Sequence, residues 1–249
     1  MFEERFIEGD SLIHRLDPRV KSIVAAAFSI VVAVSDRFTA LIPALIIAIS
    51  FIILARLSFH KVLARLLIVN GFIIFLWVML PFTTEGPRLF SIGPLTVTGT
   101  GIHTAALITL KSNAIILTLI SLTATMSVFT MGRALDDLHV PSKIVHLIFL
   151  TYRYIHVIYQ EYNRLIKAVK IRGFRPRNNI HTYRTYAYLV GMLFVKSYDR
   201  AERVRAAMLC RGFQGRFYDL KDFKLKASDL VIMVLMLMSV SAIVVLQWL

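Results

Sequence analysis

Residues 164–177 read RLIKAVKIRGFRPR, and residues 203–216 repeat the same pattern as RVRAAMLCRGFQGR. The two segments lie 39 positions apart and share an Arg, an Ala four residues later, the tripeptide Arg-Gly-Phe and a final Arg. In each segment good helix formers precede an Arg and then a Gly, the residue that most often takes the left-handed conformation just beyond a helix end. The repeat therefore predicts two long helices that end alike, at Arg172-Gly173 and at Arg211-Gly212.

An Arg in this position has two possible roles. It is favoured at any helix end because the last carbonyl groups carry partial negative charge. Its guanidinium can also extend outward and bind a carboxylate or carbonyl groups of another protein. The repeat therefore indicates either two ordinary basic helix ends or a pair of binding tips formed by Arg172, Gly173, Arg211 and Gly212. The supporting basic residues would be Arg175, Arg177 and Arg216.

The composition is that of a polytopic membrane protein. Of the 249 residues, 57% are hydrophobic, and the mean hydropathy is +0.68. These values lie above those of soluble domains. The net charge of +14 raises the alternative of a membrane-anchored nucleic-acid binder, but the sequence contains no recognisable nucleic-acid module. We therefore expect the lipid bilayer, and no nucleic acid, as a partner.

Five apolar segments predict transmembrane helices, so the expected fold class is an all-α polytopic membrane protein with about five spans. They cover residues 18–34, 39–57, 66–80, 102–129 and 230–249. Residues 83–101 are rich in Gly and Pro and predict an external loop, with a short hairpin at 89–98.

The predicted organisation has three parts. Residues 1–129 form a membrane region with four spans, residues 130–226 a cytoplasmic region and residues 227–249 the last span. The cytoplasmic region carries 19 of the 29 Lys and Arg residues. Within it, apolar residues at alternating spacings of three and four predict helices over 142–173 and 184–211 that pack on each other.

The distribution of basic residues predicts the orientation. With a cytoplasmic amino terminus, 26 Lys and Arg residues lie inside and only Arg37 and Arg88 lie outside, with Lys111 in the membrane. Because basic residues concentrate on the cytoplasmic side, this multi-pass orientation is favoured, and it places both Arg-Gly tips in the cytoplasm.

A few residues could carry chemistry inside or near the membrane. Lys111 is either an intramembrane polar site or a side chain that extends to the outer surface. Asp136, Asp137, His139 or Lys111 could serve an integral membrane enzyme. Alternatively, Asp136 and Asp137 belong to a short connector helix that is ended by Pro141. The sequence contains no phosphate-binding G-x-x-x-x-G-K-[ST] loop, one cysteine and scattered histidines. We therefore expect no ATP hydrolysis by this chain, no metal site and no cofactor.

The chain resembles the transmembrane T component of energy-coupling factor transporters, in particular the CbiQ branch associated with cobalt and nickel uptake. The resemblance covers essentially the whole chain. It rests on the segment LDPRVK at residues 16–21, on the five-span layout with one long insertion and on the two Arg-Gly tips. In that family the residue before each Arg is usually alanine, whereas here it is Ile171 and Cys210.

The resemblance implies a coupling role rather than an enzymatic one. In the family, the arginine of each tip docks into a groove on one of two cytoplasmic P-loop ATPases, a role that falls here to Arg172 and Arg211. Closure of the ATPase dimer would draw the tips together and move a separate substrate-binding membrane subunit in a prokaryotic inner membrane. The implied substrate is cobalt or nickel ion. A vitamin-type importer and an integral membrane enzyme are the alternatives.

Overall fold

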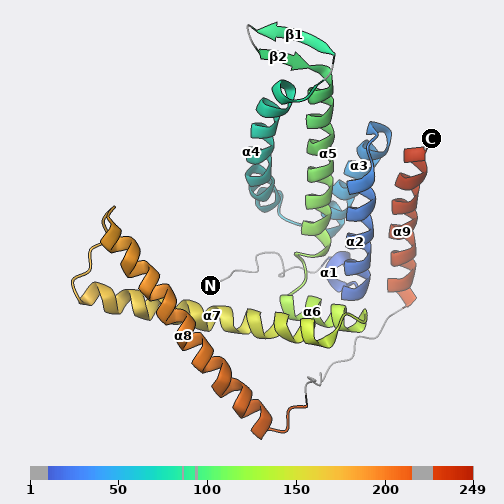
Figure 1. The fold of residues 1–249 in the computed structure, drawn as a ribbon. Coiled ribbons are helices and arrows are strands. Elements are labelled where there is room, and N and C mark those ends of the chain that lie inside the picture. The colour runs from blue at the N-terminus through green and yellow to red at the C-terminus, as the bar shows by residue number, and fades with distance from the viewer. Residues whose placement is uncertain (1–10, 86, 93–94, 215–226, 249) are drawn as a thin grey trace. The chain divides into compact units, whose positions relative to one another are not determined.

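The computed structural model describes residues 11–85, 87–92, 95–214 and 227–248 (Figure 1). This part of the chain is helical apart from one two-stranded hairpin, which confirms the predicted fold class. The chain divides into two compact units. One, named here the crossed-helix unit, falls within Asp136–Asp222, and the other, the membrane unit, comprises the residues before and after it. The helices are α1 Leu12–Arg15, α2 Pro18–Val34, α3 Phe38–Ala55, α4 Phe59–Thr83, α5 Gly99–Leu122, α6 Val128–Asp137, α7 Ser142–Ile171, α8 Ile180–Cys210 and α9 Ala227–Trp248.

The core of the membrane unit lies where α2, α3, α5 and α9 meet (Figure 1). On α3, Ala40, Ala44 and Ala48 are fully buried and recur every fourth residue, so they line one face of the helix. Small side chains allow neighbouring helices to approach closely, which is how helices associate where lipid replaces water. Larger side chains complete the core, among them Phe28 of α2 and Ile243 of α9.

Four helices, α3, α4, α5 and α9, are long and apolar enough to cross a membrane. They correspond to four of the five predicted spans. The first predicted span, α2, begins as expected, with Pro18 as its first residue and the Asp17 carboxylate accepting from the Arg19 amide at 2.9 Å. Its 17 residues give about 26 Å of helix, slightly less than the hydrocarbon core of a bilayer. Its position across the membrane remains a prediction.

The boundaries predicted for the third span were wrong at both ends. Instead of starting near residue 66, α4 starts at Phe59, so Lys61 and Arg65 lie within its first two turns. Lys and Arg are good helix formers, and residues 59–65 contain no Gly or Pro. At the other end the helix continues past Pro81 to Thr83, because a proline in the last turn removes only one backbone hydrogen bond.

The predicted end of the fourth span was also wrong. The prediction reached residue 129, whereas α5 ends at Leu122 and a turn separates it from α6. Two side chains compete with the helical hydrogen bonds here. The hydroxyl of Thr125 donates to the carbonyl oxygens of Ser121 and Leu122 at 3.1 and 3.0 Å, and the Ser127 hydroxyl accepts from the Thr130 amide at the start of α6.

The predicted hairpin is confirmed. Strands β1 (Arg88–Ile92) and β2 (Leu95–Thr98) pair antiparallel, with Ile92 opposite Leu95. Thr98 anchors the hairpin to the end of α4, since its buried hydroxyl donates to the carbonyl oxygens of Pro81 and Thr84 at 3.1 and 3.0 Å. The hairpin therefore closes the connection between α4 and α5 (Figure 1).

The crossed-helix unit consists of α7 and α8, each about 45 Å long at 1.5 Å per residue. We expected α8 to begin at residue 184, but it begins at Ile180 because Asn179 caps it, its side-chain oxygen accepting from the Thr182 amide at 2.9 Å. The predicted packing along both apolar faces is only partly correct. The two helices cross, as helices with inclined side-chain ridges do (Figure 1). Ile144 and Phe194, on the predicted apolar faces, therefore remain exposed.

Candidate functional site

The first Arg-Gly tip is a Schellman cap, a hydrogen-bonded reversal at the end of a helix. α7 ends at Ile171, Arg172 is the capping residue, and Gly173 follows with a φ of +85°. The Phe174 amide donates to the Val169 carbonyl at 3.2 Å, and the Gly173 amide donates to the Lys170 carbonyl at 3.0 Å. These two bonds define the motif and satisfy carbonyl groups that the helix itself leaves unpaired.

The second tip has the same geometry. α8 ends at Cys210, Arg211 is the capping residue, and Gly212 has a φ of +76°. The Phe213 amide donates to the Met208 carbonyl at 3.0 Å, and the Gly212 amide donates to the Leu209 carbonyl at 3.0 Å. The repeated Arg-Gly-Phe pattern thus produces the same backbone conformation twice, as predicted, and both arginine side chains are exposed.

The phenylalanine of each tip contacts the other helix near its start. The ring of Phe174, after α7, lies 5.9 Å from the ring of Tyr186 and 6.2 Å from that of His181, both on α8. The ring of Phe213, after α8, lies 6.4 Å from that of His146 on α7. Such aromatic pairs contribute about 0.5–1.5 kcal/mol beyond the area they bury. Each tip is therefore held against the beginning of the opposite helix.

An ion pair that we did not predict joins the two helices. The Lys196 ammonium of α8 donates to a Glu161 carboxylate oxygen of α7 at 2.5 Å, and Arg164 lies 3.5 Å from the other carboxylate oxygen. The hydrogen bond from Lys196, together with the charges of Lys196, Arg164 and Arg200, holds the pKa of Glu161 below its usual 4.5. Glu161 is the one acidic residue of α7, a signal that could have identified it from the sequence.

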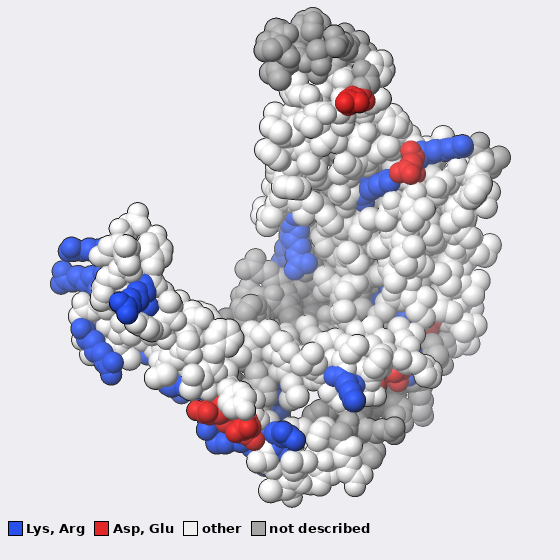
Figure 2. Space-filling view, in the orientation of Figure 1, with Lys and Arg blue, Asp and Glu red and all other residues white. Residues whose placement is uncertain are grey.

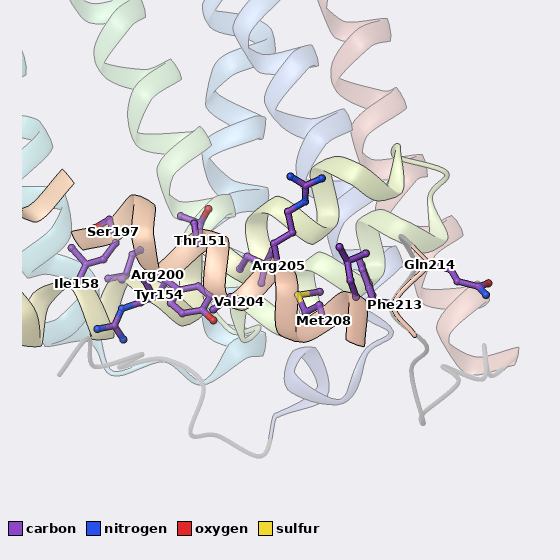
Figure 3. Close-up of a pocket in the computed structure, with 14 residues that line it drawn as sticks. Thr151, Tyr154, Ile158, Ser197, Arg200, Val204, Arg205, Met208, Phe213 and Gln214 are labelled. Carbon is purple, nitrogen blue, oxygen red and sulfur yellow. The ribbon is translucent and has the colours of Figure 1, made fainter. Parts of the chain in front are cut away.

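A largely apolar groove of about 790 Å³ lies between α7 and the last part of α8 (Figure 3). Tyr154 and Ile158 line it from α7, and Val204 and Met208 from α8. Arg200 and Arg205 extend to opposite sides of it (Figure 3). The groove exists because the helices diverge from their crossing, leaving part of their apolar faces uncovered.

The other predicted basic residues lie near the first tip. Arg175 and Arg177 are exposed in the connection between α7 and α8, and the Arg177 amide donates to the Thr182 hydroxyl at 3.0 Å. Arg216 lies outside the described residues. Basic side chains are abundant on the visible face of the crossed-helix unit, whereas the membrane helices present mainly uncharged residues (Figure 2).

Lys111, the predicted intramembrane charge, has a partner in the membrane unit. Its ammonium donates to the Asp36 carboxylate at 2.7 Å and to the Ala33 carbonyl at 3.1 Å. Asp36 lies in the turn between α2 and α3, and its side chain is 79% exposed. Lys111 thus extends to the end of the neighbouring helices and connects α5 to that turn.

Asp136, Asp137 and His139, three of the four residues of the enzyme hypothesis, do not form an enclosed site. Asp136 and Asp137 end the connector helix α6, which was predicted, and His139 follows in a left-handed conformation with a φ of +63°. All three residues are exposed. Among the residues that the structure describes, no group of three His, Cys, Asp or Glu side chains could hold a metal ion.

Fold and sequence together define the class of protein as a multi-pass helical membrane protein with a separate pair of crossed helices. The chain belongs to the CbiQ family of cobalt transport proteins, whose sequence pattern matches residues 9–221. Together with the three relatives described next, this match confirms the resemblance to the T components of energy-coupling factor transporters.

Three relatives agree with this assignment, and each is named as an energy-coupling factor transporter transmembrane protein. The relative from Thermosediminibacter oceani is 26% identical, and the alignment covers 91% of this chain and 90% of the relative. The relative from Streptococcus equi subsp. equi is 27% identical, and the alignment covers 94% of this chain and 92% of the relative. The relative from Bacillus subtilis is 29% identical, and the alignment covers 85% of this chain and 84% of the relative. They are thus named as transporter components and not as enzymes.

Proposed function

We propose that this chain is the coupling subunit of an ATP-driven importer and that its two Arg-Gly tips each bind one subunit of a cytoplasmic P-loop ATPase dimer. The observation that carries the proposal is the repeated tip: two long helices end in the same Schellman cap, each with an exposed arginine. A guanidinium held at a rigid helix end can form charge-assisted hydrogen bonds, each contributing about 1.5–3 kcal/mol.

The contacts within the crossed-helix unit favour transmission of movement. The Glu161–Lys196 ion pair and the two phenylalanine contacts join the helices at three places. Because α7 and α8 are continuous helices of about 45 Å, a displacement at one tip moves the whole helix. Closure of the ATPase dimer would draw the tips toward each other, change the crossing of the helices and move a separate substrate-binding membrane subunit.

The proposed substrate is cobalt or nickel ion, bound by that separate subunit. The proposal is supported by the description of the family as cobalt transport proteins. A vitamin-type importer is the alternative, and the names of the three relatives specify no substrate. Uptake of radioactive cobalt, nickel and labelled vitamins by cells with and without this chain would distinguish the two.

The proposed location is the inner membrane of a prokaryote, with the amino terminus and both tips in the cytoplasm. The charge asymmetry of the sequence supports this orientation.

The decisive experiment is a pull-down of the tagged chain from its own cells in mild detergent. P-loop ATPases should accompany the wild-type chain and be lost from Arg172→Glu/Arg211→Glu. The matched control is Lys167→Glu/Arg203→Glu, which makes the same change in charge at two exposed residues of the same helices, five and eight positions before the tip arginines. It should retain the ATPases. ATPases that stay with the tip variant, or that both variants lose equally, would show that the tips are ordinary helix ends.

The enzyme hypothesis requires a different result. Asp136→Asn, Asp137→Asn and His139→Ala should leave uptake unchanged if the chain only couples ATPases to a substrate-binding subunit. Loss of a chemical turnover measured with the isolated chain would instead favour an integral membrane enzyme.

A further inference from the structure

A second pocket adjoins the groove at the end of α8, and it places one more arginine beside the second tip. Its volume is about 650 Å³. Arg153 lines it from α7, and Arg211 and Gly212 line it from the tip of α8. Several of its apolar side chains also line the groove of Figure 3, so the pocket and the groove share part of their lining. The residues that line both are Leu150, Tyr154, Val204, Met208 and Phe213.

The charge in this pocket is uncompensated within the described part of the chain. Neither Arg153 nor Arg211 forms an ion pair with a described residue, and no acidic residue lines the pocket. Arg153 and Arg211 are both exposed and line the same pocket, so an anion bound there would lower the repulsion between their positive charges. A carboxylate is well suited, because it can accept hydrogen bonds from both guanidinium groups.

The structure also explains why Arg153 lies at this tip. The contact between Phe213 and His146 holds the end of α8 against the first half of α7, where Arg153 lies about two turns further along. At the first tip, Phe174 instead contacts His181 and Tyr186, and no residue of that tip lines either hollow. The two tips therefore share a backbone conformation but differ in their surroundings.

We propose that Arg153 and Arg211 together bind one carboxylate of the partner ATPase, presented beside an apolar side chain that contacts Met208 and Phe213. The inference rests on the proposed function and deepens it, because it names a contact outside the Arg-Gly repeat and the chemistry of the segment that docks there. It also makes the second tip a two-arginine site.

A double-mutant cycle tests the proposal, with the ATPases that co-purify with the wild-type chain as the probe. The dissociation constant is measured for the wild type, Arg153→Gln, Arg211→Gln and the double variant. Each single change should weaken binding about tenfold, since each removes a charge-assisted contact. Because both arginines bind the same carboxylate, the double variant should be weaker by only about 20-fold, well below the roughly 100-fold product expected of independent sites.

The controls separate a shared site from general electrostatic attraction. Arg203 is exposed on α8 and lines neither hollow, so Arg203→Gln should bind within about twofold of the wild type. Arg153→Lys keeps the charge but not the forked donor geometry, so its dissociation constant should lie between those of the wild type and of Arg153→Gln. Equal weakening by Arg203→Gln, or single effects that simply multiply, would overturn the proposal.

The outcomes also distinguish this inference from the proposed function. If Arg211→Gln has no effect, the proposed function itself fails at this tip. If Arg211→Gln weakens ATPase binding while Arg153→Gln does not, only the two-arginine site is wrong. If Arg153→Gln reduces the binding of phosphatidylglycerol in nanodiscs but leaves the affinity for the ATPases unchanged, the pocket binds a lipid headgroup, and the inference is also overturned.

Discussion

Lys196 and Glu161 are 35 residues apart in the sequence, yet their side chains form the ion pair that joins α8 to α7, at 2.5 Å. Lys196 lies near the middle of α8, and Glu161 lies about two thirds of the way along α7. The pair therefore joins the two helices away from their ends. Because displacement grows with distance from a pivot, a small change in the crossing angle would move the tips most.

This pair should make the stability of the crossed-helix unit depend on pH. Because the pKa of Glu161 is lowered in the folded chain, its stabilising contribution is complete above the usual value of 4.5 and is lost as the pH falls through the lowered pKa. The unfolding midpoint of Lys196→Gln should lie below that of the wild type at neutral pH, and the difference should disappear in acid. An equal difference at all pH values would contradict this assignment.

The two tip glycines should be intolerant of side chains for a conformational reason alone. Gly173 and Gly212 have positive φ, and a Cβ added to either would meet no atom within 4 Å. Gly173→Ala and Gly212→Ala should each cost about 1–2 kcal/mol, measured by chemical unfolding.

Gly191 provides the control for those substitutions. It lies within α8, where a Cβ would also meet no atom within 4 Å, and it lacks the positive φ of the tips. Gly191→Ala should therefore stabilise the chain by about 0.5–1 kcal/mol, because alanine is the better helix former. Destabilisation by all three substitutions would show that crowding matters here and not φ.

Gly101 should be intolerant for a different reason, which is crowding. A Cβ at this position in α5 would lie 2.6 Å from both the Leu80 carbonyl oxygen and the Pro81 Cα of α4. Gly101→Ala should therefore separate the ends of α4 and α5 and cost about 1–3 kcal/mol. The thermal unfolding midpoint in detergent measures this loss, and Gly71→Ala, which faces open space on α4, serves as the control.

The pair between Lys111 and Asp36 should be structural rather than essential to transport. Because the Asp36 side chain is largely exposed, Lys111→Met and Asp36→Asn should each cost at most about 1 kcal/mol and leave uptake close to that of the wild type. The exchange Asp36→Lys/Lys111→Asp should recover part of the loss. Uptake abolished by Lys111→Met at wild-type stability would instead identify Lys111 as an intramembrane functional site.

Cys210 offers a direct test of the orientation, because it is the one cysteine of the chain, lies at the second tip and is exposed. A membrane-impermeant maleimide should leave it unlabelled in intact spheroplasts and label it once the membrane is permeabilised. In a Cys210→Ser background, Glu85→Cys, at an exposed residue between α4 and β1, should show the opposite pattern. Labelling of Cys210 in intact spheroplasts would contradict the proposed orientation and indicate the opposite one.

Most of the fold could be predicted because it depends on local sequence. The Schellman caps are formed by residues within six positions of one another, so Arg-Gly-Phe after good helix formers was sufficient to predict both. The hairpin was predicted from the positions of Gly and Pro residues, and the membrane class was predicted from the composition. The span boundaries were predicted less accurately because hydrophobicity alone does not set them. The start of α4 depends on basic residues that are good helix formers, and the end of α5 depends on hydrogen bonds of the Thr125 hydroxyl.

The sequence by itself determined the class of protein, the two helix ends and the exposed arginine at each, because backbone conformation and hydrophobicity follow from nearby residues. Only the tertiary structure decided which side chains meet: Glu161 with Lys196, Lys111 with Asp36, and Arg153 with Arg211 around one pocket. Periodicity predicts that two helices have apolar faces but not the angle at which they cross. That angle, set by packing between residues far apart in the chain, determines which charges come together at the second tip.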